Sequence, residues 1–278
     1  MTLNFVKMHG AGNDFVMIDD RDERVPWQDH ILIAALAARR TGVGCEGVIL
    51  VQPSPRADFR MRFLNPDGAE VEMCGNGARC VAAFAHAIGA AGRTMTIETL
   101  CGLLDAELTD VGVRVWMPEP AKRRYDLDVA VADATVKGHF VNTGVPHFVV
   151  PVAEVGRVDV DREGRALRLH PAFAPDGVNV DFVTLRPPDR LSMRTFERGV
   201  EAESGACGTG AVACAVVAVE TAGFTLPVRI RTTTGYELIV DGDWRSGQCT
   251  GLTLTGPARE VYRGTIDTEA LVLGDEME

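Results

Sequence analysis

The chain has 278 residues, of which 46% are hydrophobic and 24% charged, and its formal net charge is −11 at pH 7. This length accommodates two domains, and the composition is that of an ordinary globular protein. The acidic balance argues against a nucleic-acid groove or an anionic membrane surface, because both need clustered Lys and Arg. The acidic balance does not exclude a small anionic substrate, because one arginine or one helix terminus can bind an anion.

The sequence shows no targeting segment. The N-terminus has no basic stretch followed by an apolar run, as a signal peptide would. The longest apolar stretch, residues 210–219, is too short to span a bilayer. Seven cysteines form an odd set, which favours reduced thiols over a disulfide framework. We therefore expect a cytoplasmic protein.

The first half of the chain reads as strands around one apolar helix. A helix is expected at residues 28–40, ending at Gly42, and a second, apolar nearly all round, after Cys74. Period-2 patterns and turn residues predict strands at 3–8, 14–19, 47–54, 59–68, 94–102, 103–110 and 113–118.

The second half repeats this order. Its apolar helix is expected at 209–223, with a C-cap glycine, and its strands at 138–152 (two strands and a turn), 178–185, 191–199, 227–235, 236–242 and 249–266. The stretch "MPEPAKRRYD", residues 117–126, is rich in Pro and charge and is the expected boundary. The pattern predicts a mixed α/β (α+β) fold of two similar lobes that face each other.

Two short blocks carry the chemistry. "CGNGA" begins at Cys74 and "CGTGA" at Cys207, nearly half a chain length apart. Each cysteine lies at the point where a turn leads into the N-terminus of an apolar helix. Unpaired N–H groups and the helix dipole at such an N-terminus can lower the pKa of a thiol, and they can bind a carboxylate or phosphate. Two such thiols suit inversion of a carbon next to a carboxylate, since one group removes a proton and the other delivers one to the opposite face.

Other interpretations of these blocks are weaker. A lone cysteine before a helix is more often a small buried hydrophobe, and we interpret the remaining cysteines in that way: Cys45, Cys80, Cys101, Cys214 and Cys249. The spacing of the cysteines does not match a structural zinc site, and no G-x-x-x-x-G-K-[ST] motif is present. We expect no metal and no pyridoxal cofactor.

Several long motifs, in their order along the chain, resemble those of the diaminopimelate epimerase family. Members of this family are cofactor-independent amino-acid epimerases. The motifs are "KMHGAGNDFVMID", "FLNPDGAEVEMCGNGARC", "NTGVPHFVV", "GVNVDFV" and "FERGVEAESGACGTGAVACA". The resemblance implies two pseudo-symmetric lobes, each a strand-rich, barrel-like sheet around a central helix, with the active site in the cleft between them. The lobes would be residues 1–117 plus a returning C-terminal strand 265–278, and residues 118–264.

The resemblance also implies an activity. It is the conversion of LL-2,6-diaminopimelate to the meso isomer in lysine and peptidoglycan precursor biosynthesis, by a homodimer in which Tyr262 matches a dimer-contact position. Cys74 and Cys207 would be the acid/base pair. The substrate-binding positions would be Asn13, Asn65, Gly75, Asn76, Asn179, Glu197, Arg198, Gly208 and Thr209, and His147 and Glu197 would tune the thiols.

The residues themselves leave alternatives open at several of these positions. Asn13 and Asn65 lie beside turns, where Asn often caps only backbone, and His147 suits a structural role equally well. Glu197 and Arg198 are adjacent in a strand, so the side-chain period would turn only one inward. His9 is interpreted as structural. Val145 stands where many family members carry Asn, and Gly47 stands where some members carry Gln.

Two other functions stay open at the level of sequence. A racemase of another amino acid could use the same fold, and the role of Arg198 would discriminate it, because a planar guanidinium suits a distal carboxylate. A non-catalytic binder of a small acid would need the cradle but not both thiols. Two thiols that serve one carbon would also be prone to oxidise to a disulfide.

Overall fold

The computed structural model describes residues 1–71, 74–132, 134–245 and 247–271. The chain forms two compact units: residues 1–115 together with those from 256 onward, and residues 116–255. The sequence places the two divisions slightly later, after residues 117 and 264. The second division differs more because the whole of the last strand, not only its end, pairs within the first unit.

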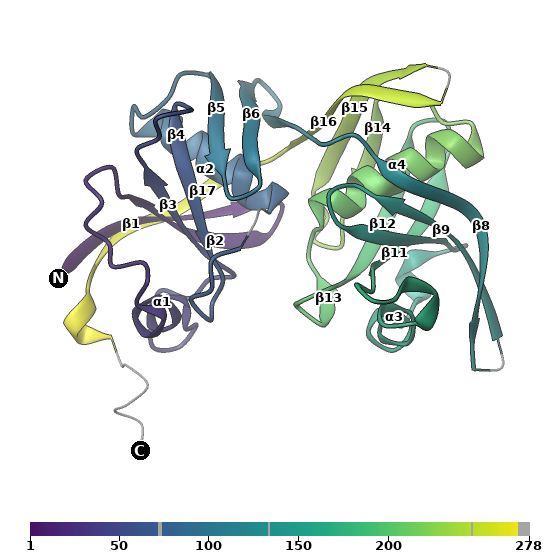
Figure 1. Cartoon of the computed structure of the whole chain (residues 1–278), viewed down its shortest axis with the longest axis horizontal. Helices are drawn as coiled ribbons and strands as arrows, with labels where there is room; N and C mark the ends of the chain where they lie inside the picture. Colours follow the sequence, from purple (N-terminus) through teal and green to yellow (C-terminus); the bar gives the residue numbers. More distant parts are fainter. Residues whose placement is uncertain (72–73, 133, 246, 272–278) are drawn as a thin grey trace. The chain divides into compact units, whose positions relative to one another are not determined.

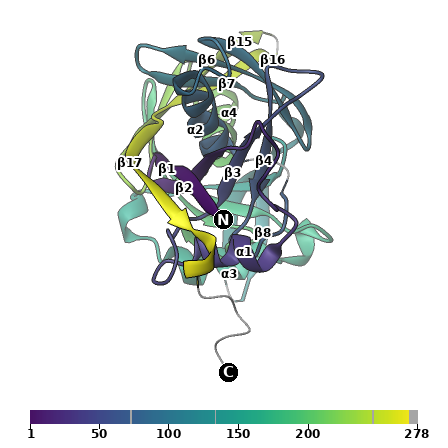
Figure 2. The same ribbon diagram turned by 90° about the vertical axis from the view of Figure 1, so that its left-hand side faces the viewer.

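Unit 1 is a mixed sheet with two helices (Figures 1 and 2). Its strands pair in the order β17-β1-β2-β3-β4-β5-β6-β7. Their bounds are Thr2–Gly10 (β1), Asn13–Asp19 (β2), Val48–Gln52 (β3), Phe59–Leu64 (β4), Thr94–Thr99 (β5), Gly102–Thr109 (β6), Gly112–Trp116 (β7) and Arg259–Asp267 (β17). The helices are His30–Ala37 (α1) and Gly75–Ala87 (α2).

Unit 2 has the same plan. Its helices are Val160–Arg168 (α3) and Gly208–Ala222 (α4), with 3₁₀ turns at Val155–Arg157 and Pro171–Phe173; a further 3₁₀ turn, Thr268–Ala270, belongs to unit 1. Its strands are Ala121–Val131 (β8), Ala134–Asn142 (β9), Pro146–Pro151 (β10), Asn179–Arg186 (β11), Arg190–Glu197 (β12), Ala202–Ser204 (β13), Val228–Arg231 (β14), Glu237–Arg245 (β15) and Gln248–Gly256 (β16).

The internal repeat is visible in the strand pairing. From β1 to β7 the successive pairs are antiparallel, parallel, antiparallel, parallel, antiparallel and antiparallel. From β9 through β12 and β14 to β16 the same series recurs. A helix lies in each parallel crossover, as such connections require. The two-lobed α/β class expected from the sequence is confirmed.

Helices cover both faces of the sheet in unit 1. Val16, Ile18, Val48 and Leu50 belong to the buried cluster that packs under α1. Their neighbours Phe15 and Ile49 point the other way and lie against Gly77 of α2. Strands that are buried on both faces are apolar at every position, which explains the unbroken run "GVILV".

Unit 2 is built in the same way, with α3 and α4 in the places of α1 and α2. Phe148, Phe182 and Phe196 pack with Val160 and Leu167 of α3. Gly164 of α3 lies so close to Phe196 that an added Cβ would be 2.3 Å from its Cβ. Helix α4, buried along most of its length, ends at Gly223, whose φ of 71° is the left-handed conformation of a C-cap glycine.

Three expectations for secondary structure were wrong or incomplete. The boundary stretch 117–126 contains the start of strand β8, and α3 was not predicted. The stretch 249–266 is two strands, since pairing stops at Gly256 and resumes at Arg259. No helix in the described parts of the chain is long and apolar enough to cross a bilayer.

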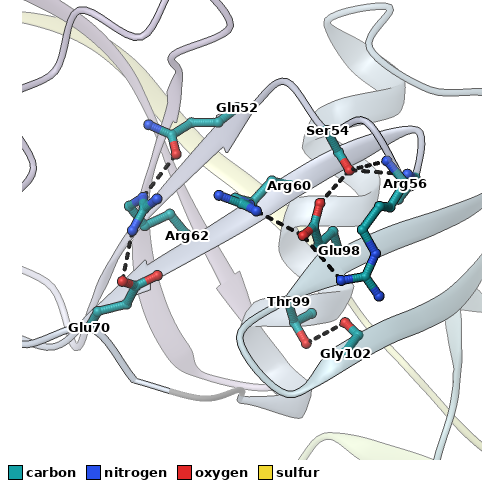
Figure 3. A network of polar contacts seen from close by, with 10 residues as sticks. Gln52, Ser54, Arg56, Arg60, Arg62, Glu70, Glu98, Thr99 and Gly102 are labelled. Atoms are coloured by element: carbon teal, nitrogen blue, oxygen red, sulfur yellow. Dashed lines mark hydrogen bonds and ion pairs between the residues drawn. The ribbon is translucent and has the colours of Figure 1, made fainter.

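A network of ion pairs joins β3, β4 and β5 at one side of unit 1 (Figure 3). Glu98 on β5 accepts hydrogen bonds from the Ser54 hydroxyl and from Arg60 Nη2, the latter at 2.8 Å. Nearby, Arg62 donates to Gln52 Oε1 at 2.9 Å and to Glu70 Oε2 at 2.7 Å. The Ser54 and Arg60 bonds hold the pKa of Glu98 below its ordinary value of 4.5.

Glu98→Gln tests this network. A carboxyl whose pKa is lowered on folding stabilises the protein above its unfolded pKa, and that stability is lost as the pH falls through the folded value. We expect the variant to be less stable than the parent chain at pH 7, with the difference shrinking as the pH is lowered below 4.5. Urea denaturation at a series of pH values measures it. The matched control is Glu107→Gln, which removes a more exposed pair with Arg114 and should change little. A pH-independent difference for Glu98→Gln would contradict the assignment.

Candidate active site

Cys74 is the N-cap residue of α2 in unit 1. Its carbonyl accepts the first helical hydrogen bond, from Ala78 N at 2.8 Å. Two glycines allow the N-terminus of this helix to pack closely against the sheet. A Cβ on Gly77 would lie 2.9 Å from Ile49 Cδ1, and a Cβ on Gly10 would lie 2.7 Å from Asn76 O. The first N–H groups of a helix have no carbonyl acceptor within it, and those of Gly75 and Asn76 lie at this end of α2.

The Cys74 thiol contacts an amide from β2. Cys74 Sγ donates to Asn13 Oδ1 at 3.5 Å, and Asn76 Nδ2 approaches the same oxygen at 3.3 Å. The other end of the Asn13 amide donates to the Glu46 carboxylate. The structure therefore brings three of the predicted positions together in unit 1: Cys74, Asn13 and Asn76.

A buried arginine lies behind them. Arg79 is 0% exposed; its Nη2 donates to Asn76 Oδ1 at 2.6 Å and its Nη1 to Gly75 O at 3.3 Å. It forms no ion pair with a carboxylate in the part of the chain that the structure describes, and its Nε has no hydrogen-bond partner there. Burial lowers the pKa of this guanidinium, while negative charge on Cys80 or Cys74 raises it. A positive charge thus stands beneath the Cys74 end of the helix.

Cys207 is the N-cap residue of α4 in unit 2. Its carbonyl accepts from Ala211 N at 3.0 Å, and its sulfur accepts from Gly210 N at 3.4 Å. The Thr143 hydroxyl donates to Thr209 O at 2.9 Å and so anchors the first turn to the β9–β10 connection. Gly208 and Thr209 hold the same places in this turn as Gly75 and Asn76 do in α2.

The electrostatic surroundings of Cys207 are negative. Burial raises the pKa of its thiol well above the ordinary value, and the carboxylates of Glu197 and Asp181 raise it further. The hydrogen bond with the Thr209 hydroxyl and the one from the Gly210 amide lower this pKa but are outweighed. The lowered thiol pKa expected at a helix N-terminus is therefore not found at Cys207, because burial and the nearby carboxyl groups raise it.

His147 lies behind Cys207 in a chain of polar groups, of which the side chains of His147 and Asp181 are fully buried. Its Nδ1 is 2.7 Å from Asp181 Oδ2, and its Nε2 is 3.0 Å from Thr209 Oγ1. Thr209 Oγ1 is in turn 3.5 Å from Cys207 Sγ. Asp181 Oδ1 accepts from the Thr195 hydroxyl at 2.7 Å. A structural histidine and a functional one were both open from the sequence, and this connection to the thiol favours function.

Asn179, Glu197 and Arg198 meet at the ends of β11 and β12. Asn179 Oδ1 accepts from the backbone N of Arg198 at 2.7 Å, and its Nδ2 donates to Pro146 O at 3.3 Å. Arg198 lies beyond the end of β12, so the strand period does not govern its direction, and both it and Glu197 are half-buried. Burial raises the pKa of the Glu197 carboxyl.

Of the remaining positions, Asn65 and Gly47 fall in loops and His9 lies in β1. Asn65 closes a turn through its backbone, accepting from Gly68 N and donating to Ala69 O, both at 2.9 Å. Its side-chain amide makes no hydrogen bond to any other residue that the structure describes. The ring of Phe63 occupies the space beside Gly47, since a Cβ on Gly47 would lie 2.3 Å from Phe63 Cε2. His9 Nδ1 accepts from Gly12 N at 3.2 Å, which agrees with its structural interpretation.

The other cysteines are structural, with one correction. Cys45, Cys80, Cys214 and Cys249 are buried as expected, but Cys101 is exposed because it lies in the turn between β5 and β6. None of the seven cysteines, all of which lie in the described ranges, forms a disulfide. Among the described residues, no three His, Cys, Asp or Glu side chains are grouped closely enough to hold a metal ion.

Comparisons with known proteins agree with the resemblance seen in the motifs. The family model "Diaminopimelate epimerase" matches residues 5–123 and 139–259. The chain belongs to the diaminopimelate epimerase family. It is 41% identical to the diaminopimelate epimerase of Aquifex aeolicus over 97% of this chain and 99% of that protein. Identity to the diaminopimelate epimerase of Chlorobaculum tepidum is also 41%, over 93% of this chain and 99% of that protein.

Solved structures show that the fold of diaminopimelate epimerases is shared more widely. A Bacillus anthracis phenazine biosynthesis protein of the PhzF family superposes with a TM-score of 0.74 at 16% identity, covering 96% of this chain and 99% of that one. A hydroxyproline epimerase from Agrobacterium vitis gives 0.70 at 18% identity, covering 95% and 92%. At this identity the likeness concerns the fold alone.

Two polar residues beside the thiols of this family member were not singled out from its sequence. Asp181 is a carboxylate within the apolar strand "VNVDFV", and Arg79 is a cation in the otherwise apolar helix "ARCVAAFAHA". Both are fully buried. A charged residue in the middle of a fully buried element is the available signal, because burying it without a role is costly.

Proposed function

We propose that this chain interconverts LL-2,6-diaminopimelate and meso-diaminopimelate without a cofactor, with Cys74 and Cys207 exchanging the proton at one α-carbon. The observation that carries the proposal is the equivalent placement of the two cysteines, each as the N-cap of the buried central helix of its unit. Relatives that match along nearly the whole chain are named for this activity.

In the proposed reaction, one cysteine as thiolate removes the α-proton from one face of the carbon, and the other as thiol delivers its proton to the opposite face. The roles exchange in the reverse direction. The N-terminal turns of α2 and α4 would bind the substrate carboxylate, where their N–H groups stabilise the negative charge that develops as the α-proton leaves. The raised pKa of Cys207 suits the thiol that donates.

Replacing either cysteine tests the two-base mechanism. Cys74→Ala and Cys207→Ala should each lower epimerisation by about 10²-fold or more, the usual contribution of one general acid or base. Proton NMR of LL-diaminopimelate in D₂O, with reduced protein, follows loss of the α-proton signal and appearance of the meso isomer.

Cys101→Ala is the matched control, because this exposed thiol lies in a turn outside the site and should keep full activity. Full turnover by Cys74→Ala or Cys207→Ala would refute the mechanism. Ligand binding without any proton exchange in the parent chain would identify a binding protein instead.

Arg198 tests the substrate. We propose that its guanidinium pairs with the distal carboxylate of diaminopimelate, a planar group that fits a bidentate donor. Arg198→Ala should then raise KM for diaminopimelate strongly. The control is Arg190→Ala at the opposite end of β12, which should leave KM unchanged. An unchanged KM in Arg198→Ala, or faster proton exchange with another amino acid than with diaminopimelate, would favour a different racemase.

We also propose a homodimer that forms through β17, in a cytoplasmic enzyme of lysine and peptidoglycan precursor biosynthesis. Tyr262 supports the dimer: it is 44% exposed beside exposed Val261, and its ring packs edge-on against Phe5 at 5.9 Å. Tyr262→Glu should shift the sedimentation coefficient from dimer to monomer. A monomer in the parent chain would overturn this part of the proposal.

A further inference from the structure

Polar side chains of unit 2 form a continuous path to Cys207. It runs from Asp181 on β11 to His147 on β10, then to Thr209 and Cys207 at the start of α4, with separations of 2.7, 3.0 and 3.5 Å. The side chains of Asp181 and His147 are 0% exposed. Neither side chain is exposed to solvent, and Thr209, which is partly exposed, links His147 to Cys207.

The hydrogen-bond directions follow from the acceptors. A carboxylate can only accept hydrogen bonds, and Asp181 Oδ1 accepts one from the Thr195 hydroxyl. Its Oδ2 therefore accepts the hydrogen bond that the N–H at His147 Nδ1 donates. A neutral imidazole with its proton on Nδ1 has an acceptor at Nε2, which faces the Thr209 hydroxyl. Thr209 donates there, and its oxygen is left to accept from the Cys207 thiol.

We propose, on the basis of the function above, that Asp181 is a positioning residue that fixes the proton of His147 on Nδ1, so that the Thr209 hydroxyl relays the Cys207 thiol proton to Nε2. In the step, the S–H proton moves to Thr209 Oγ1 while the Thr209 proton moves to His147 Nε2. The products are a Cys207 thiolate and an imidazolium paired with Asp181. The reverse step restores the thiol.

The surroundings of Cys207 show why such a relay is needed. The titratable groups that face it are Glu197 from β12, Asp181 from β11, His147 from β10 and Cys214 from α4. The carboxylates disfavour the thiolate, yet the thiolate is required in the direction in which Cys207 removes the α-proton. An imidazolium formed on the same path offsets that negative charge at the moment when the thiolate appears.

Gly210 is the feature of the backbone that allows the arrangement. A Cβ at this position would lie 2.4 Å from Asp181 Oδ1. The equivalent glycine of unit 1, Gly77, faces the apolar Ile49 instead. The same close approach of helix to strand therefore holds a carboxylate in one unit and a methyl group in the other.

The first test is the tautomer of His147, read by ¹⁵N NMR of substrate-free protein and assigned by its loss in His147→Gln. The proton is expected on Nδ1. In Asp181→Asn the amide oxygen would accept from Thr195 and the NH₂ would face Nδ1, which moves the proton to Nε2. His139, whose Nδ1 accepts from Asp126 N, is the internal control. A proton on Nε2 in the parent chain, or no change in Asp181→Asn, would overturn the proposal.

The second test compares Thr209→Val with Thr209→Ser, which differ in the hydroxyl and keep the backbone cradle. The valine variant should lose about 10²-fold or more in kcat with little change in KM, and the serine variant should stay close to the parent. In substrate-free protein, the pH midpoint of Cys207 alkylation should be higher in the valine variant. Equal midpoints and equal kcat would overturn the relay. The NMR and alkylation results do not depend on diaminopimelate, so a failure of the proposed substrate is distinguishable.

Discussion

The structure depends on the burial of a helix N-terminus against a sheet. This end of a helix carries unpaired N–H groups, which cost free energy when they leave water without a partner. Glycines at Gly77 and Gly210 allow the approach, and a carboxylate ligand is the group that would satisfy those donors. The proposed anion site and the buried central helix would both follow from one packing arrangement, which the chain contains twice.

The duplication has preserved the backbone and diverged in the side chains. At the second helical position of α2, Asn76 contacts both Asn13, the partner of Cys74, and the buried Arg79. At the same position of α4, Thr209 contacts both Cys207 and His147, which pairs with Asp181. One thiol thus has a cation behind it and the other has carboxylates. A symmetric fold with asymmetric charges suits a reaction in which one thiol must hold a proton while the other must lack one.

The sequence predicted the central helices, most strands and the place of two cysteines at helix N-termini, because their patterns are local. It missed α3, although the helix at the equivalent place in the first half was expected, since α3 has few apolar residues and depends on the contact of Gly164 with Phe196. It could not assign Asp181 or Arg79, because their partners come from other elements. The raised pKa of Cys207 likewise arises from burial and distant carboxylates rather than from its motif.

The pairing of β17 with β1 brings the two ends of the described chain together in unit 1, from Thr2 beside Asp267 to His9 beside Arg259. Unit 2, by contrast, is one continuous segment. During synthesis, the second unit has all its strands before the first unit receives its last one. The sheet of unit 1 would therefore be completed last, and a chain truncated before β17 would expose the edge of β1 as an unpaired strand.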